Sequence, residues 1–273
     1  MRHTAGVTGF LALMVFSFTA LSCHPKPPEP DELVVAVAAN LGDVFQALGK
    51  DYEKQTGTRI TLSVGATLNL AQQLRYGAPF DLFVSADRET PLKLSQEGHL
   101  IPESVTVYAR GQLVVWTSPS NGFAVEKLDD LLDAGITRIG VASPQVAPYG
   151  KAAQEALEAV GLWKQLLPKV VFGAHVKHVQ QYAASGNVEA AFLPSSLVAS
   201  VASVSSVSSV SSIGGRFFPV DARLYSPLDQ ALGVVTSSVN QEEAQRLADF
   251  VGSTRGQAFL KRAGYQVGVE GKP

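Results

Sequence analysis

The chain has 273 residues, of which 46% are hydrophobic and 17% are charged, and its formal net charge is −2. This composition is typical of a globular protein with one or two domains and a sizeable core. The near-neutral charge disfavours a nucleic-acid-binding protein, which requires a basic face. We therefore expect no nucleic-acid partner.

The N-terminus has the features of an export signal followed by a tether. An apolar run over residues 10–21 follows Arg2 and is too short for a comfortable membrane span, which predicts a signal peptide over residues 1–22. Cys23, the only cysteine, follows Ala20-Leu21-Ser22. This pattern resembles a bacterial lipobox, in which the cysteine is lipidated. The alternative is a plain signal peptide that is cut nearby. The proline-rich residues 23–31 are predicted to form an extended tether.

From residue 33 onward, apolar strand patterns alternate with amphipathic helix patterns. This alternation predicts an α/β fold with largely parallel sheets. The expected strands are 33–38, 59–64, 79–87, 112–118, 138–144, 169–173, 188–194 and 229–237. The expected helices are 41–55, 68–76, 91–97, 149–160, 175–184, 242–252 and 256–265.

A serine- and valine-rich repeat occupies residues 198–213, with valine at every third position from Val201 to Val210. A period of three fits neither a helix nor a strand well. The composition favours a surface segment produced by a tandem expansion, and a partner-contact loop is the alternative.

Four of the predicted strand-to-helix turns are each expected to place free backbone N–H groups at the start of a helix. They are Ala39-Asn40, the turn at Thr67, the turn at Pro148-Tyr149 and the turn at Val176. Asn and Thr are preferred helix N-cap types, and proline is common at the first helical position. Each turn leaves unpaired backbone N–H groups at the positive end of a helix dipole. Because ligands of open α/β sheets bind at the carboxyl ends of the strands, two facing lobes could bring these turns together as an anion site.

At these turns the sequence resembles the periplasmic molybdate-binding proteins of ABC importers, the ModA family. The resemblance covers about residues 32–268. It is carried by VAVAANLGDVFQAL, SVGATLNLAQQLRYGAPFDLFVSAD, IGVASPQVAPYGKAAQEAL and YSPLDQALGVV, and GAPFDLFVSAD is the most distinctive.

The resemblance implies a two-lobed periplasmic-binding-protein fold, type II-like, with the ligand in the interlobe cleft. The ligand would be molybdate or tungstate, held as an oxyanion without any other cofactor. The contacts carried over by motif are Ala39, Asn40, Thr67, Tyr149 and Val176. The expected protein is a monomer that delivers the anion to an ABC importer permease. It would act on the periplasmic or cell-surface side, attached to a membrane only through a lipid on Cys23.

The resemblance together with the strand pattern also divides the chain. The first lobe is expected to take residues 32–109 and 224–273, and the second residues 110–223. Closure about the two crossings would bury the ion and present a closed face to the permease.

Three positions depart from the family pattern. Asn40 and Thr67 stand where serine is often found, and Leu193 stands where some members have a tyrosine hydroxyl contact. Leucine cannot donate a hydrogen bond, and Ser195 and Ser196 are the nearby hydroxyls. These departures leave open which oxyanion is preferred.

Other functions stay open at this point. The first is a binding protein for another tetrahedral oxyanion, such as sulfate or phosphate. The second is an enzyme, for which Ser85 with Asp87, or the pair His175 and His178, are the local candidates; the chain has no recognisable phosphate loop or nucleophile elbow, and we expect no enzyme. The third is a lipoprotein that serves as a sensor or adhesin, with the serine- and valine-rich repeat as its contact site.

Overall fold

The structure is a computed structural model that describes residues 32–118, 125–198 and 215–268. The predicted signal peptide, Cys23 and the proline-rich tether lie outside the described residues, as does nearly all of the serine- and valine-rich repeat. No helix in the described ranges is long and apolar enough to cross a bilayer.

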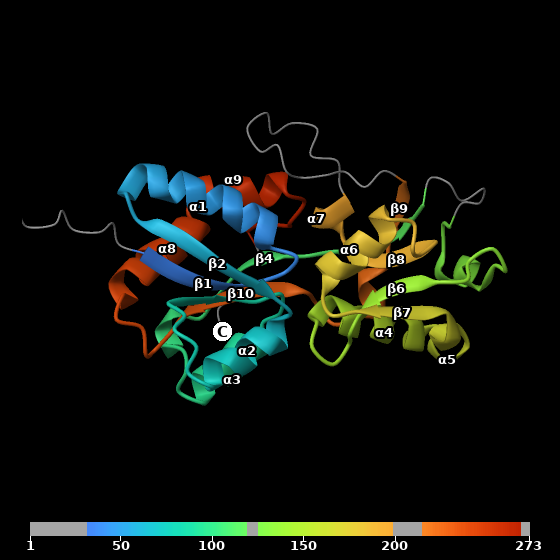
Figure 1. The fold of residues 1–273 in the computed structure, drawn as a ribbon, viewed down its shortest axis with the longest axis horizontal. Helices are drawn as coiled ribbons and strands as arrows, with labels where there is room; N and C mark the ends of the chain where they lie inside the picture. The colour runs from blue at the N-terminus through green and yellow to red at the C-terminus, as the bar shows by residue number, and fades with distance from the viewer. Residues whose placement is uncertain (1–31, 119–124, 199–214, 269–273) are drawn as a thin grey trace, which may run out of the picture.

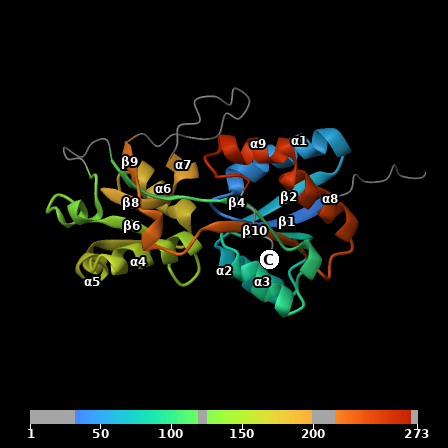
Figure 2. The ribbon, with the colours of Figure 1, turned by 180° about the vertical axis from the view of Figure 1, so that it is seen from behind.

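Two lobes lie side by side, and each is built around a five-stranded sheet (Figures 1 and 2). The strand order is β2-β1-β3-β10-β4 in the first lobe and β7-β6-β8-β5-β9 in the second. The first sheet contains β1 (Glu32–Ala38), β2 (Arg59–Gly65), β3 (Leu82–Val84), β4 (Thr106–Arg110) and β10 (Asp229–Val234). The second contains β5 (Leu113–Thr117), β6 (Ile139–Ala142), β7 (Val170–Gly173), β8 (Ala190–Pro194) and β9 (Arg216–Pro219).

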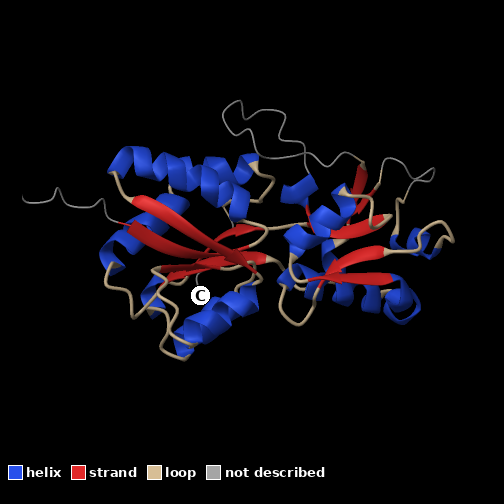
Figure 3. Ribbon diagram, viewed as in Figure 1, coloured by secondary structure: helices blue, strands red, loops and turns tan. Residues whose placement is uncertain are grey.

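Helices cover both faces of each sheet (Figure 3). In the first lobe α1 (Gly42–Thr56), α8 (Gln241–Gly252) and α9 (Thr254–Arg262) lie on one face, and α2 (Thr67–Arg75) and α3 (Glu89–Gln96) on the other. In the second lobe α6 (Val176–Ala184) and α7 (Ser195–Val198) lie opposite α4 (Pro148–Ala159) and α5 (Trp163–Leu166). Short 3-10 turns connect several elements: η1 (Pro102–Ser104), η2 (Leu128–Leu132), η3 (Leu167–Lys169) and η4 (Ala222–Leu224).

The strand directions are largely parallel, as the sequence predicts, with one reversed strand in each sheet. β10 pairs antiparallel with β3 and β4, and β5 pairs antiparallel with β8 and β9. Both reversed strands enter their sheet directly from a crossing between the lobes. β4 and β9 do not have a strand pattern in the sequence; both are short edge strands with charged or exposed residues.

The hydrophobic pattern places the core where the helices and sheets meet. The central strand β1 is almost fully buried from Leu33 to Ala38, because sheets covered on both faces need apolar residues on both sides. α4 ends at Ala159, one residue before the predicted end, and Gly161 just beyond it adopts a left-handed backbone with φ of 75°.

Two crossings join the lobes. The chain leaves the first sheet after Arg110 and enters β5 at Leu113, and it returns to the first sheet at Asp229. The N–H of Gly111 donates to the carbonyl of Leu228 at 2.9 Å, so the two crossings are hydrogen-bonded to each other. The lobe boundaries at 109/110 and 223/224 stay predictions; in the structure Arg110 is still the last residue of β4.

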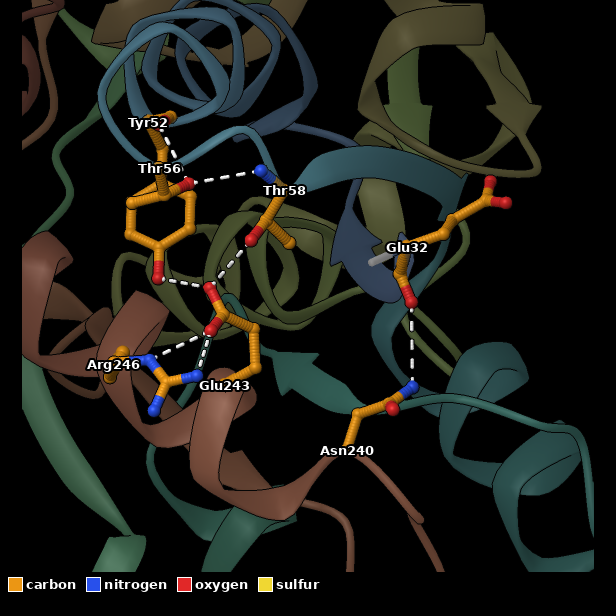
Figure 4. Close-up of polar contacts among 7 residues, drawn as sticks. All are labelled: Glu32, Tyr52, Thr56, Thr58, Asn240, Glu243 and Arg246. Carbon is orange, nitrogen blue, oxygen red and sulfur yellow. Dashed lines mark hydrogen bonds and ion pairs between the residues drawn. The ribbon is translucent and has the colours of Figure 1, made fainter. Parts of the chain in front are cut away.

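A polar cluster around Glu243 ties α8 to the C-terminal half of α1 and to the start of β2 (Figure 4). Glu243 accepts hydrogen bonds from the hydroxyls of Tyr52 at 2.6 Å and Thr58 at 2.9 Å, and it pairs with Arg246. Nearby, Asn240 Nδ2 donates to the carbonyl of Glu32 at 3.4 Å. These bonds hold the helix against α1 and β2, and they leave the far ends of the strands free for the interlobe region.

Candidate functional site

In the turn after β1, one backbone N–H has no partner among the described groups. The N–H of Ala39 donates to the carbonyl of Gly65 at 2.9 Å, and the N–H of Leu41 donates to that of Ala38 at 2.8 Å. Between them, the N–H of Asn40 donates to no described group. The N–H of Ala39 is therefore used within the fold, and its contact with the anion stays a prediction.

Asn40 does not cap α1, which is a difference from the expectation. The helix begins at Gly42 with Leu41 as its N-cap, and no side chain caps it. The Asn40 amide instead donates to Gln230 Oε1 at 2.8 Å and to the hydroxyl of Tyr265 at 3.0 Å. The side chain is therefore directed toward Gln230 and Tyr265 of the first lobe rather than along the helix.

Thr67 is the first residue of α2, and Ala66 takes the N-cap position. The N–H of Thr67 has no partner among the described groups. Its Oγ1 accepts from the N–H of Ala86 at 3.3 Å, and its own hydroxyl hydrogen is donated to no described group. Thr67 therefore offers two uncharged donors, one from the main chain and one from the side chain.

Tyr149 follows Pro148, which opens α4 at the position where its missing N–H costs nothing. The N–H of Tyr149 is likewise without a partner in the described residues. Its phenol is buried against the first crossing: a Cβ at Gly111 would lie 1.9 Å from the hydroxyl oxygen. That hydroxyl has no hydrogen-bond partner among the described groups, and burial raises the pKa of Tyr149 well above its usual range.

Val176 opens α6, and His175 caps that helix. The Nδ1 atom of His175 accepts from the N–H of His178 at 3.3 Å, and the two rings pack with centroids 4.0 Å apart. Burial and the neighbouring His178 lower the pKa of His175, so its imidazole is neutral at pH 7 and can accept this bond. The N–H of Val176 donates to no described group.

Contacts across the lobes bring these helix starts together. The N–H of Leu68, next to Thr67, donates to the carbonyl of Val146 at 3.1 Å, just before the start of α4. Asp43 in the first turn of α1 pairs with Lys177 in the first turn of α6. Asn40, Thr67, Tyr149 and Val176 are at most 4% exposed. The structure is thus a closed form, and at the lobe interface it buries four N–H donors that have no partner within residues 32–118, 125–198 and 215–268.

Such an arrangement suits an anion. Three of the donors lie in the first turns of α2, α4 and α6, where the helix dipoles are positive, and the fourth lies just before α1. All of these donors are uncharged.

Sequence reasoning missed two residues that hold this region together, Gln230 and Tyr265. They contact Asn40 across 190 and 225 residues of sequence, so no local pattern could place them. The candidates near Leu193 also have other roles. Leu193 is fully buried in β8, the hydroxyl of Ser195 donates to the carbonyl of Gly264, and that of Ser196 donates to Tyr265.

The residues considered for catalysis have structural contacts. Asp87 accepts from the N–H of Thr90 at 2.8 Å and from its hydroxyl at 3.1 Å, so it is bound to the first turn of α3. Burial raises the pKa of Asp87, although these hydrogen bonds oppose the shift. Ser85 Oγ lies 3.3 Å from Asp87 Oδ1. The described residues contain no group of three His, Cys, Asp or Glu side chains that could hold a metal ion.

Comparisons with known proteins agree with this architecture. A molybdate-binding protein, ModA, of Azotobacter vinelandii is 32% identical over 234 residues, which cover 86% of this chain and 89% of that protein. The solved structure of the A. vinelandii periplasmic molybdate-binding protein matches with a TM-score of 0.78 and 28% identity, covering 86% of this chain and 99% of that one. A putative ABC transporter substrate-binding lipoprotein of Bacillus subtilis is 25% identical over 266 residues, or 94% of this chain and 96% of that protein.

These matches confirm the predicted two-lobed periplasmic-binding-protein fold. Residues 33–266 match the family described as bacterial extracellular solute-binding protein, and this chain belongs to that family.

Proposed function

We propose that this protein captures molybdate, and tungstate by the same geometry, and delivers it to an ABC importer permease. The observation that carries the proposal is the set of four buried N–H groups, at Asn40, Thr67, Tyr149 and Val176, that have no partner in the part of the chain that the structure describes. The molybdate-binding relative, similar along most of its length, supports the choice of ligand. The oxyanion would receive hydrogen bonds from these donors and from the Thr67 hydroxyl, with Ala39 packed beside it.

The chemistry of the donors supports a small dianion. Hydrogen bonds to a charged group stabilise by about 1.5–3 kcal/mol each, so several together allow submicromolar binding. Uncharged donors also avoid leaving a buried cation without a partner before the anion arrives. No other cofactor enters the proposal.

Selectivity should follow size and protonation. Molybdate and tungstate have nearly the same size, so one donor set fits both. Sulfate is smaller and would leave some donors unsatisfied, and a protonated phosphate brings a hydrogen that a set of donors cannot accept. These two anions remain the alternative ligands.

The remaining parts of the proposal concern location and assembly. The family is extracellular by its description, and we place the protein on the periplasmic or cell-surface side, attached to a membrane through a lipid on Cys23. The similarity to a putative B. subtilis lipoprotein supports the anchor. We further propose that the protein acts as a monomer whose closed face meets the permease.

Isothermal titration with molybdate, tungstate, sulfate and phosphate tests the ligand. We expect tight one-to-one binding of molybdate and tungstate, with weak or no binding of the other two. A protein that releases no heat with molybdate or tungstate but binds sulfate or phosphate would contradict the proposed ligand and leave the fold assignment intact.

A further inference from the structure

The orientation of the Gln230 amide is fixed by its surroundings. Its Nε2 donates to two carbonyls, that of Ala86 at 3.1 Å and that of Leu228 at 2.7 Å. A flipped amide would place Oε1 against both carbonyls. The fully buried Oε1 must therefore face Asn40 as a hydrogen-bond acceptor.

This orientation fixes the Asn40 amide in turn. Its Nδ2 carries two hydrogens, and one is donated to Gln230 Oε1 while the other is donated to the hydroxyl of Tyr265. No hydrogen of the side chain is left for an anion. The donor that Asn40 can still offer is its main-chain N–H.

Tyr265 is the third residue in this series of hydrogen bonds, after Gln230 and Asn40. Its hydroxyl donates its one hydrogen and also accepts two hydrogen bonds. Its single hydrogen is donated to the carbonyl of Asn40 at 2.9 Å, because a carbonyl can only accept. The same oxygen accepts from Asn40 Nδ2 and from Ser196 Oγ at 3.1 Å. Burial raises the pKa of Tyr265, so the hydroxyl keeps its hydrogen at neutral pH.

The segment that carries Tyr265 is held from both sides. Gln266 forms a two-way backbone bridge with Arg110 at the first crossing, at 2.8 and 2.9 Å. Ser195 and Ser196, at the start of α7 in the second lobe, bond to Gly264 and Tyr265. Tyr265 thus connects the second lobe to a site residue of the first.

We propose that Tyr265 is the positioning residue of the anion site: its hydroxyl, anchored by Ser196, fixes the carbonyl and the side-chain amide of Asn40 so that the Asn40 main-chain N–H meets the oxyanion. This inference rests on the proposed function for the identity of the anion. It predicts that one hydroxyl, which itself touches no ligand, sets the affinity.

The test compares Tyr265→Phe with the matched variant Tyr225→Phe in the complete protein. Tyr225 is also buried near the crossings, and its hydroxyl accepts from the N–H of Leu113 at 3.2 Å without contacting Asn40. Titration with molybdate should give binding about tenfold weaker for Y265F, the effect of one lost charge-assisted donor. The Kd of Y225F should stay within twofold, even where thermal unfolding shows a similar loss of stability.

A second measurement does not depend on the ligand. NMR signals of the Asn40 main-chain N–H and side-chain NH2, recorded without anion, should shift in Y265F and stay in place in Y225F. Unchanged Asn40 signals in Y265F would overturn the inference, and so would an unchanged Kd in a protein that binds molybdate. If the wild type fails to bind molybdate, the proposed function fails, and the NMR result still decides whether Tyr265 positions Asn40.

Should Y265F not fold, Ser196→Ala replaces it, because that variant removes only the anchor of the Tyr265 hydroxyl. Binding about threefold weaker, with a smaller shift of the Asn40 signals, is then expected. A variant S196A with wild-type affinity and wild-type Asn40 signals would overturn the inference.

Discussion

The carboxylate of Asp43 and the ammonium group of Lys177 form an ion pair that joins the first turn of α1 in one lobe to the first turn of α6 in the other. Both side chains are partly exposed, at 29% and 25%. An open form with separated lobes would break this pair. The Asp43–Lys177 pair therefore favours the closed form, but only weakly, because partly exposed ion pairs contribute about 1 kcal/mol or less to stability.

Replacing Lys177 with methionine should weaken molybdate binding about three- to tenfold at low salt. The variant loses the interlobe pair and leaves the negative charge of Asp43 close to a dianion, so both effects act in the same direction. In Asp43→Asn the two effects oppose each other, and a smaller change is expected. Titrations at low and high salt measure both variants; an unchanged affinity of K177M at low salt would contradict this role.

The Thr67 hydroxyl should contribute to affinity as a donor. Thr67→Val keeps the shape of the side chain but removes the hydroxyl, and we expect molybdate binding to weaken about tenfold or more. Thr67→Ser keeps the donor and serves as the matched control, with binding close to that of the wild type. Equal dissociation constants for the valine and serine variants in calorimetry would show that only the main chain of Thr67 is used.

The Tyr149 side chain should not be needed for binding, because its free donor is the main-chain N–H. Tyr149→Phe removes a buried hydroxyl that has no described partner. We expect unchanged molybdate affinity and a free energy of unfolding equal to or up to about 1 kcal/mol above that of the wild type. A large loss of affinity in this variant would mean that the phenol contacts the anion directly.

Gly111 should tolerate no larger residue while Tyr149 is present. An added Cβ would lie 1.9 Å from the Tyr149 hydroxyl and 3.2 Å from Gln230 Nε2. Gly111→Ala is therefore expected to cost about 2 kcal/mol or more of stability in denaturant titrations. The double variant G111A/Y149F should recover part of that loss, and the absence of any recovery would place the strain elsewhere.

Glu243 should make the protein sensitive to acid. Burial raises the pKa of this carboxyl, but the hydrogen bonds from Tyr52, Arg246 and Thr58 outweigh it and bring the pKa below its ordinary value of 4.5. A lowered folded-state pKa contributes stability that is present above the unfolded value and is lost as the pH falls through the folded value. Glu243→Gln should be less stable than the wild type at pH 7.

The decisive comparison for Glu243 is the slope of stability against pH. Between pH 5 and pH 3 the wild type should lose more free energy of unfolding than E243Q, because only the wild type has this carboxylate to protonate. Parallel curves for the two proteins would show that other carboxylates govern acid unfolding.

Local patterns were sufficient for much of the fold and for two of the turns at the candidate site. Apolar runs predicted the central strands, and Pro148 and Thr67 marked the starts of α4 and α2 correctly. These signals act over a few residues, within which helix and strand preferences operate. β4 and β9 could not be predicted, because these edge strands carry charged or exposed residues, such as Arg110 and Arg216, that interrupt the apolar pattern.

The roles of Asn40, Gln230 and Tyr265 could not be read from the sequence. An asparagine before a helix usually caps it, yet here its amide is drawn away by two partners that the fold brings near. The sequence also could not show that the N–H of Ala39 is paired, because its partner is the carbonyl of Gly65 on a neighbouring strand. Such competition between local and distant partners is decided only when the lobes are assembled.

The strand order of the first sheet also sets the order in which the molecule can be built. β10 lies between β3 and β4, and it comes from a part of the chain that follows the whole of the second lobe. The second sheet uses the continuous stretch from Leu113 to Pro219. In a chain that emerges from its N-terminus, the lobe that begins first is therefore completed last. Until β10 is in place, β3 and β4 each have an unpaired edge. Such an edge can pair with a strand of another chain and aggregate, or be bound by a chaperone.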